Sequence, residues 1–294
     1  MRKLTGWMFL AAFVSGVLIV NVASADMSEQ SELTKRHQFD MGTEFSHMTY
    51  HESEGGVTTK GMAYGLFGVY NYRSPQEFFA SNLVNVYHVD VHVNYSAVDQ
   101  TAQWVASGIN DYIVEPRIWF GKDLMLNSNA RVTPYVGVGY RYLTDQMGGH
   151  SSANGQDTFD RRQQYLYLPL GTEIAFIPAA GWEMRINGEY DYLIRGWHTS
   201  TYSQIPTPDA TLKFPDITNK QMNGFGLRGS VDLIKRGDRV NFTLSPYVRY
   251  WNVRHSNTVS ASNTVPSVGT ATIVDSFVPN NTSTEIGARL GVQF

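Results

Sequence analysis

The amino-acid sequence predicts an all-β chain: a transmembrane antiparallel up-and-down β-barrel of about ten strands, with long extracellular loops and short periplasmic turns. Three observations predict this fold. The first 25 residues have the order of an export signal, later segments alternate apolar and polar residues with a period of two, and aromatic residues gather at both ends of the apolar faces. A membrane barrel has all three features, because it is exported, alternates lipid-facing with lumen-facing residues and meets water at two interfaces.

The composition is poor in charge and rich in aromatic residues and glycine. The 294 residues include 17 Tyr, 15 Phe, 6 Trp and 26 Gly, and only 17% are charged, which favours strands and turns over surface helices. The net charge of −3 gives no indication of a nucleic-acid partner. The absence of cysteine excludes a disulfide framework, a Cys-ligated zinc site, a thiol nucleophile and a lipid-anchored lipoprotein.

Residues 1–25 have the order of a cleaved secretory signal peptide. A short basic stretch precedes an apolar run over 4–22, and an A-x-A cleavage pattern follows at 23–25. The alternative, an uncleaved membrane anchor, is disfavoured because small residues end the run and no basic flank follows it. We therefore expect an exported chain with a short periplasmic tail over 26–36 and a barrel over 37–294.

Ten segments show the period-two alternation of a strand with one apolar face. In 132–142, valine, proline and tyrosine occupy the even positions, whereas threonine, glycine and arginine occupy most odd positions. A helix would need a period of 3.6, and the glycine and proline of this segment would break it. The predicted strands are 37–50, 57–72, 83–95, 110–121, 131–144, 162–177, 181–196, 219–234, 239–254 and 283–294.

Aromatic residues distinguish a membrane barrel from a soluble sandwich, which would show the same alternation. They lie at the two ends of the apolar faces with aliphatic residues between them, as the two water interfaces of a bilayer require. The lower belt contains Phe39, Tyr72, Tyr87, Phe120, Phe176, Trp182, Phe242 and Phe294, and the upper belt contains Tyr95, Tyr112, Tyr140, Tyr142, Tyr190, Tyr192, Phe225 and Tyr250.

The last strand ends in a terminal phenylalanine. Its apolar face consists of Ile286, Ala288, Leu290, Val292 and Phe294. This face resembles the C-terminal signal of Gram-negative outer-membrane β-barrel proteins, and the segments 134–142 and 245–252 look like those of small, mostly uncharacterised barrels of that superfamily. The resemblance implies an outer-membrane location, contact with outer-membrane lipid and lipopolysaccharide, and recognition by the barrel-assembly machinery. The residues of this assembly signal are Ile286, Leu290, Val292 and Phe294.

The polar strand faces carry acids and arginines that we expect to face the lumen. A barrel of about ten strands is only slightly wider than the eight-stranded kind, whose interior side chains fill it. Arginine forms bidentate pairs with carboxylates, so we expect a crosslinked network that plugs the barrel, with a narrow charge-lined pore as the alternative. The predicted network contains Asp40, Glu44, His88, Asp90, His92, Glu115, Arg117, Arg141, Glu173, Glu183, Arg185, Glu189, Asp191, Arg195, Arg228, Asp232, Arg249, Glu285 and Arg289.

Two pairs of titratable residues are catalytic candidates. Ten strands is also the size of the omptin proteases, outer-membrane enzymes with paired acids and an Asp–His couple near the outer rim. Asp90 and His92 share one strand face, and Glu189 and Asp191 share another. Both pairs lie near mid-strand, and neither their order nor their flanking residues match omptins. We therefore expect these residues to belong to the lumen network and the protein not to be an enzyme.

No metal ion or other cofactor is expected. His88 and His92 are about 13 Å apart along a strand, too far to bind one ion. The loop acids lack the spacing of a calcium-binding EF-hand loop. His198 and His255, each beside a hydroxyl residue, are candidates for a lipid-active site at the rim, but these are common loop residues.

Three long outer connections, 145–161, 197–218 and 255–282, favour a binding function, because loops on a rigid scaffold are where binding sites usually lie. Residues 270–274 are β-prone, so strands are expected to extend beyond the membrane there. The leading hypothesis is a non-enzymatic surface protein that adheres or binds an extracellular ligand through these loops. The alternatives are a narrow ion or small-solute channel and an omptin-like or lipid-active hydrolase.

Overall fold

The computed structural model describes Leu33 and residues 35–53, 58–73, 86–100, 109–148 and 157–294; for 86–100 and 109–110 it describes the backbone alone. The predicted signal peptide lies wholly outside the described residues, and the predicted periplasmic tail lies largely outside them. Glu32–Phe294 forms one compact unit. No helix in the described part of the chain is long and apolar enough to cross a membrane.

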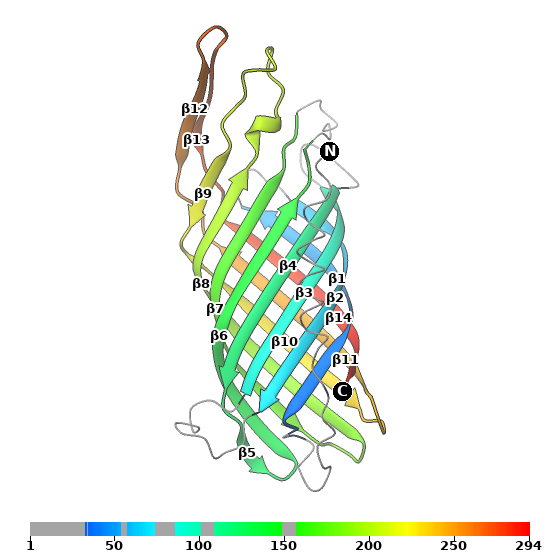
Figure 1. Cartoon of the computed structure of the whole chain (residues 1–294). Coiled ribbons are helices and arrows are strands. Elements are labelled where there is room, and N and C mark those ends of the chain that lie inside the picture. Colours follow the sequence, from blue (N-terminus) through cyan, green and yellow to red (C-terminus); the bar gives the residue numbers. More distant parts are fainter. Residues whose placement is uncertain (1–32, 34, 54–57, 74–85, 101–108, 149–156) are drawn as a thin grey trace. The chain divides into compact units, whose positions relative to one another are not determined.

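Within the described residues, ten long antiparallel strands form a closed sheet (Figure 1). They are β1 (His37–Glu52), β2 (Thr58–Arg73), β3 (Val86–Gln100), β4 (Ile109–Gly121), β6 (Ala130–Asp145), β7 (Arg161–Phe176), β8 (Trp182–Ser200), β10 (Gly224–Lys235), β11 (Asn241–Val253) and β14 (Asn281–Gln293). Each strand pairs with the next in this order, and β14 pairs with β1 to close the circle. The predicted up-and-down barrel is confirmed, and the strand bounds agree to within a few residues.

Shorter elements lie off this circle. β5 (Leu124–Asn127) pairs with the start of β6, and β9 (Ile217–Gln221) pairs with the outer end of β8. β12 (Val259–Val265) and β13 (Gly269–Ser276) form a separate hairpin that projects beyond the barrel end in Figure 1. This hairpin includes the segment that the sequence marks as β-prone. A single-turn helix, η2 (Tyr202–Gln204), lies in the connection between β8 and β9.

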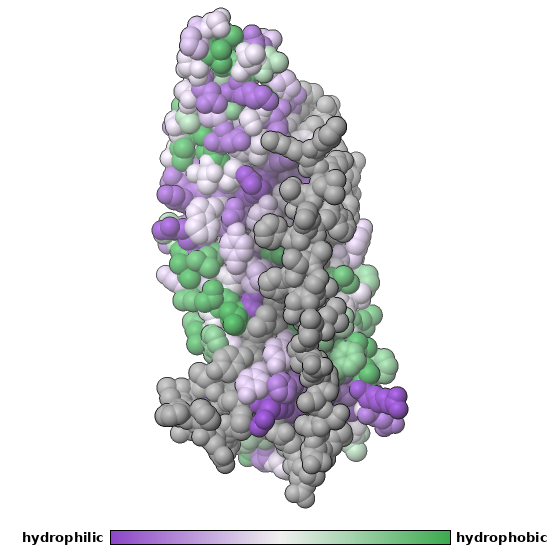
Figure 2. Space-filling model, in the orientation of Figure 1, coloured by the Kyte–Doolittle hydropathy of each residue, from purple (hydrophilic) through white to green (hydrophobic). Residues whose placement is uncertain are grey.

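The outward strand faces are apolar, as a bilayer requires. Large aliphatic side chains such as Leu66, Leu170 and Leu290 are exposed at outward positions, and Figure 2 shows apolar residues gathered along the middle of the visible wall. Aromatic side chains flank this band as predicted: Phe120, Trp182, Phe242 and Phe294 are exposed at one end, and Tyr112, Tyr190 and Tyr192 at the other. The side chains of Tyr87 and Tyr95 lie outside those described.

A β-bulge in β8 reverses the alternation near the outer rim. Leu166 and Tyr167 are neighbours on β7, yet they pair with Arg195 and Leu193, so Ile194 is an extra residue. Leu193 is 1% exposed, whereas Arg195 is exposed beside Trp197. The prediction that Arg195 faces the lumen is therefore wrong, because a strict period of two cannot anticipate an inserted residue.

The neighbouring strand changes face at the same level. Tyr192 pairs with Phe225 and Gly196 pairs with Gln221, so the break between β9 and β10 lies directly beside the bulge. The sequence predicts one strand over 219–234, whereas the structure has two, separated by Met222 and Asn223. As a result Lys220 is exposed on the same outer face as Trp197, its pairing partner.

The bulge can be tested with single cysteines, because the chain has none of its own. We expect the thiol of Arg195→Cys to react with a water-soluble maleimide in the folded protein, because position 195 is exposed. The thiol of Leu193→Cys should react only after unfolding, because that side chain is buried in the lumen. Equal reactivity of the two variants would indicate regular alternation and contradict the bulge.

Candidate functional site

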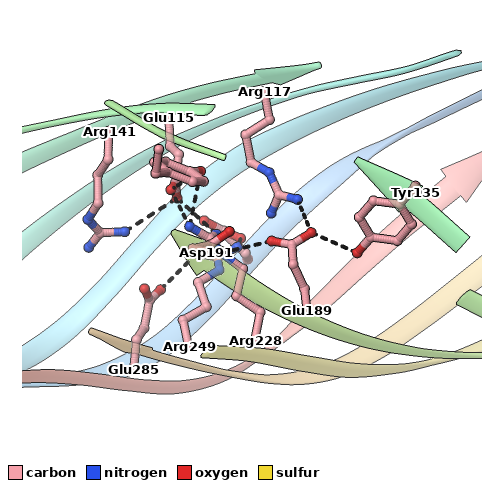
Figure 3. Close-up of polar contacts among 11 residues, drawn as sticks. Glu115, Arg117, Tyr135, Arg141, Glu189, Asp191, Arg228, Arg249 and Glu285 are labelled. Atoms are coloured by element: carbon pink, nitrogen blue, oxygen red, sulfur yellow. Dashed lines mark hydrogen bonds and ion pairs between the residues drawn. The ribbon is translucent and has the colours of Figure 1, made fainter. Parts of the chain in front are cut away.

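The inward strand faces bring arginines and carboxylates together in the lumen. Arg228 on β10 is the most connected of them: its Nε lies 2.6 Å from Asp191 Oδ2 and 3.3 Å from Glu189 Oε1, both on β8. Its terminal nitrogens reach Glu115 on β4, one of them at 3.2 Å from Oε2. Three strands separate β4 from β10 in the sheet, so this interaction crosses the lumen, as Figure 3 shows.

Further arginines and tyrosines complete this central cluster. Arg117 on β4 donates to Glu189 on β8 at 2.5 Å, and Arg141 on β6 donates to Glu115 at 3.3 Å. The hydroxyl of Tyr135 donates to Glu189 at 2.7 Å, and that of Tyr167 donates to Glu115 at 2.6 Å. Glu115 and Glu189 therefore each accept from donors on more than one strand, which is the condition for burying a charge.

Two glycines allow the tyrosines to reach these carboxylates. Tyr167 pairs with Gly139, and a Cβ at that glycine would lie 2.2 Å from the Tyr167 Cζ. Tyr135 pairs with Gly171, where a Cβ would lie 2.3 Å from the Tyr135 Cζ. Each ring therefore lies flat across the neighbouring strand because the position opposite has no side chain, and its hydroxyl extends into the lumen.

A second group joins β1, β11 and β14. Arg249 donates to Glu44 Oε2 and to Glu285 Oε1, each at 3.1 Å, and both carboxylates are buried. Glu285 Oε1 also accepts hydrogen bonds from Ser46 and Tyr247, each at 2.9 Å. This group fixes the seam at which β14 closes onto β1.

Towards the outer rim, opposite walls are joined directly. Arg161 on β7 contacts Asp145 on β6 at 2.7 Å and Glu52 on β1 at 3.5 Å. Tyr50 on β1 accepts a hydrogen bond from Gln163 on β7 at 3.4 Å. Because β1 and β7 stand on opposite sides of the circle of strands, these contacts span its full width.

The periplasmic end has its own ion pairs. Asp123 accepts from Arg73 at 2.9 Å and from Arg131 at 3.0 Å, and Arg131 also contacts Glu173 at 2.7 Å. Glu183 binds two arginines, Arg185 and Arg236, each at 2.5 Å. Ion pairs therefore occur at three levels of the described lumen, and those at the centre and the outer rim cross it.

The space left between these side chains is small. A cavity of about 40 Å³ is lined by Arg117, Arg228, Arg249 and Arg289 with neighbouring polar residues, and one of about 30 Å³ lies beside Asp111, Asp145 and Arg161. Since one water needs roughly 10–15 Å³ of such space, each cavity holds a few waters. Among the described side chains, no group of three His, Cys, Asp or Glu residues is arranged to hold a metal ion.

The remaining predicted residues have mixed outcomes. Asp40 lies 3.5 Å from the Thr243 hydroxyl, Asp232 pairs across the strands with Arg185, and the Arg289 guanidinium lies over the rings of Phe67 and Tyr247. The side chains of the β3 residues His88, Asp90 and His92 lie outside those described. The Asp90–His92 candidate thus stays a prediction. Glu189 and Asp191, the other catalytic candidates, are both paired with arginine.

The rim histidines occupy different surroundings. His198 faces inward and is buried, whereas the His255 ring contacts the backbone oxygen of Ser256 at 2.9 Å. No ion pair or hydrogen bond is described between His198 and the hydroxyls of its neighbours, so the geometry gives no support for a Ser–His–acid site there.

The sequence reasoning missed several partners. Arg131 lies on the same inward face of its strand as Arg141. Glu52 and Arg161 lie two residues and one residue beyond the predicted strand ends. Extending two predicted strands would have found Glu52 and Arg161, whereas Arg131 already lies inside the predicted strand 131–144. Tyr135 and Tyr167 carry a weaker signal, a tyrosine on a polar face opposite a glycine.

Among the comparisons with known proteins, one solved structure supports the fold. No protein-family model and no curated protein sequence matches the chain. The outer-membrane protease OmpT of Escherichia coli aligns with 92% of this chain and 99% of its own, at 10% identity and a TM-score of 0.54. The translocator domain of the autotransporter NalP from Neisseria meningitidis aligns with 98% of this chain and 94% of its own, at 10% identity and a TM-score of 0.43. A FadL homologue of Pseudomonas aeruginosa aligns with 88% of this chain and 90% of its own, at 6% identity and a TM-score of 0.29.

At these identities the likeness concerns the fold alone. The chain has the architecture of an outer-membrane β-barrel, and its outward strand faces carry the apolar belt that such barrels present to lipid.

Loss of Arg228 is expected to destabilise the barrel strongly. Arg228→Gln leaves Glu115 and Asp191 buried without their shared cation, which typically costs about 3–5 kcal/mol. Arg228→Lys keeps the charge but loses the planar fork, so its loss should be smaller. Chemical unfolding in lipid vesicles, followed by tryptophan fluorescence, measures both. Arg254→Gln, at an exposed arginine, is the control and should change the stability by less than about 0.5 kcal/mol. An Arg228→Gln variant as stable as the control would contradict the network.

Proposed function

We propose that the protein is a non-enzymatic surface protein, in which a barrel filled by ion pairs holds an ordered extracellular platform that binds a ligand or another surface. The platform consists of residues 201–216, β9 and the β12–β13 hairpin. The observation that carries the proposal is the interlocking of these segments by hydrogen bonds, because an ordered loop surface loses little entropy on binding.

Asn219 on β9 is the centre of this interlocking. Its side-chain nitrogen donates to the backbone oxygens of Asn257 and Ser276, each at 2.9 Å, and the side chain is 1% exposed. Lys220 and Asn257 exchange two further hydrogen bonds, at 2.5 and 3.0 Å. These contacts join the root of the hairpin to β9 and so to the barrel wall.

The connection over 201–216 is ordered by its own contacts. Its Tyr202 ring packs against the Phe159 ring, with the two ring centroids 4.5 Å apart. Its Lys213 backbone oxygen accepts a hydrogen bond from the side-chain nitrogen of Asn263 in the hairpin at 3.0 Å. Asp209 closes a turn by accepting from the Thr211 hydroxyl and backbone N–H, and these hydrogen bonds lower the pKa of the Asp209 carboxyl. The connection therefore supports the hairpin from one side.

The exposed surface of the hairpin combines hydroxyl groups with apolar side chains. Ser262 pairs with Thr272 and Thr264 with Thr270 across the strands, each at 2.9 Å. Val274, on β13 of the hairpin, is 67% exposed. A surface with both hydrogen-bonding and apolar groups suits recognition of a partner.

The two alternatives have less support. A channel needs a continuous path, whereas the Arg161–Glu52 and Arg228–Glu115 pairs cross the described lumen. A hydrolase needs an acid or base free to act on substrate, whereas Glu189 and Asp191 are occupied by arginine. Residues 149–156 of the loop 145–161 lie outside the described residues.

Removal of the hairpin tests the platform. A variant in which a Gly-Ser linker replaces residues 259–276 should keep its heat-modifiable gel mobility, because no barrel strand is changed. We expect the wild type, in lipid nanodiscs, to bind at least one member of a glycan array or immobilised collagen, fibronectin or mucin, and the variant to lose that binding by tenfold or more.

A second variant controls for gross loop disorder. Replacing Ser262, Thr264 and Thr272 with alanine keeps the hairpin but removes three of its exposed hydroxyls. We expect it to bind more weakly than the wild type. The proposal is wrong if the wild type binds none of these probes, or if the linker variant binds as well as the wild type.

A further inference from the structure

The outer ends of β7, β8 and β9 carry a cluster of cations on the lipid-facing side. The bulge at Ile194 turns Arg195 and Trp197 outward, and the matching break in the next strand turns Lys220 outward. Arg162 on β7 is exposed on the same face. Without the irregularity, Arg195 and Lys220 would face the lumen, so this local departure from a regular strand creates the cluster.

Trp197 lies at the centre of the cations. The Arg195 guanidinium carbon is 5.9 Å from the Trp197 ring centroid, within the range of a cation–π contact. Lys220 pairs directly with Trp197, so their Cβ atoms are about 5 Å apart. Arg162 pairs with Thr199, which places it diagonally across from Trp197 at about 7–8 Å between Cβ atoms.

The cluster lies at the depth of lipid headgroups. Tyr190 and Tyr192 mark the upper aromatic belt on β8, and Arg195 follows Tyr192 by three residues. Because Ile194 is an extra residue, their partners on β7, Leu168 and Leu166, are only two residues apart, so Arg195 lies about 7 Å further along the sheet, or about 5 Å along the membrane normal for a strand tilted by about 40°. The polar zone of a bilayer begins at the edge of the hydrocarbon core and is roughly 5–8 Å thick on each side, so Arg195 reaches it.

Few acidic groups compete for these cations. The outward positions of β7, β8 and β9 hold no Asp or Glu, and the nearby carboxylates are engaged elsewhere. Asp145 faces inward to Arg161, Asp160 accepts from Gly148 and Gln204, and Asp216 accepts from the Ser203 backbone. The cations are therefore available to a negatively charged group outside the protein.

From these observations we infer that Arg162, Arg195, Trp197 and Lys220 form a binding site for the phosphate groups of a membrane-lipid headgroup. The guanidinium groups donate paired hydrogen bonds to phosphate oxygens, and the lysine adds a point charge. Trp197 holds Arg195 from one side and rests at the interface itself. The site is separate from the extracellular platform and does not depend on its function.

The inference is tested by lipid binding to the refolded protein in nonionic micelles. The probe is fluorescent diphosphoryl lipid A, followed by anisotropy, with its dephosphorylated form and phosphatidylglycerol as parallel titrants. We expect the phosphorylated probe to bind, the dephosphorylated form to bind far more weakly, and the double variant Arg195→Gln/Lys220→Gln to weaken binding by ~30-fold, since each surface cation is worth about 1 kcal/mol.

A matched variant at the opposite rim controls for net charge. Lys235→Gln/Arg239→Gln also removes one lysine and one arginine, and Lys235 likewise lies over a tryptophan ring, that of Trp182 at 4.9 Å. It should bind lipid A within twofold of the wild type. Equal competition by phosphatidylglycerol would identify phospholipid as a second source of the same phosphate chemistry. The inference is overturned if both double variants weaken binding alike, if neither does, or if the dephosphorylated probe binds equally well.

Discussion

The contact between the Arg228 guanidinium and the buried carboxylates of Glu115 and Asp191 is the interaction on which the rest of the structure depends. It joins β10 to β4 across the lumen, so neither wall can move without exposing an unpaired charge in a medium of low polarity. Such pairs add little net stability compared with an apolar interior, but they penalise every other strand register. The network therefore favours the arrangement in which β10 and β4 face each other across the lumen.

The ion pairs of the lumen also affect the outer end of the molecule. Because the walls are held at three levels, the segments above them start from fixed positions, and Asn219 can join the β12–β13 hairpin to β9 in one geometry. At the same outer rim, the bulge at Ile194 exchanges the inward and outward faces of β8. As a result, cations there point towards lipid rather than into the network. The ion pairs inside the lumen and the outward-facing cations at the rim thus both follow from one strand arrangement.

The sequence predicts the strands and their faces well, because a bilayer outside and a polar lumen inside impose a period of two over the whole chain. It predicts the members of the network from the alternation of inward and outward positions along each strand. The prediction fails where that alternation is interrupted or where a residue lies beyond the predicted strand end. Arg195 is misplaced because one extra residue in β8 has no signature of its own, and Arg161 is missed because it lies at a strand end. Pairing across the lumen, such as Arg161 with Glu52, depends on barrel closure, which no local pattern contains.

The most direct test of the account is electrical. The refolded protein, shown to be folded by heat-modifiable gel mobility, is inserted into a planar bilayer and its conductance is recorded over a range of salt concentrations. The ion-pair network predicts a silent wild type, with steps of conductance appearing when Arg161 and Arg228 are both replaced by alanine. Steady, salt-dependent steps from the wild type would mean that the lumen is open, and they would contradict the claim that crosslinked arginines and carboxylates close this barrel.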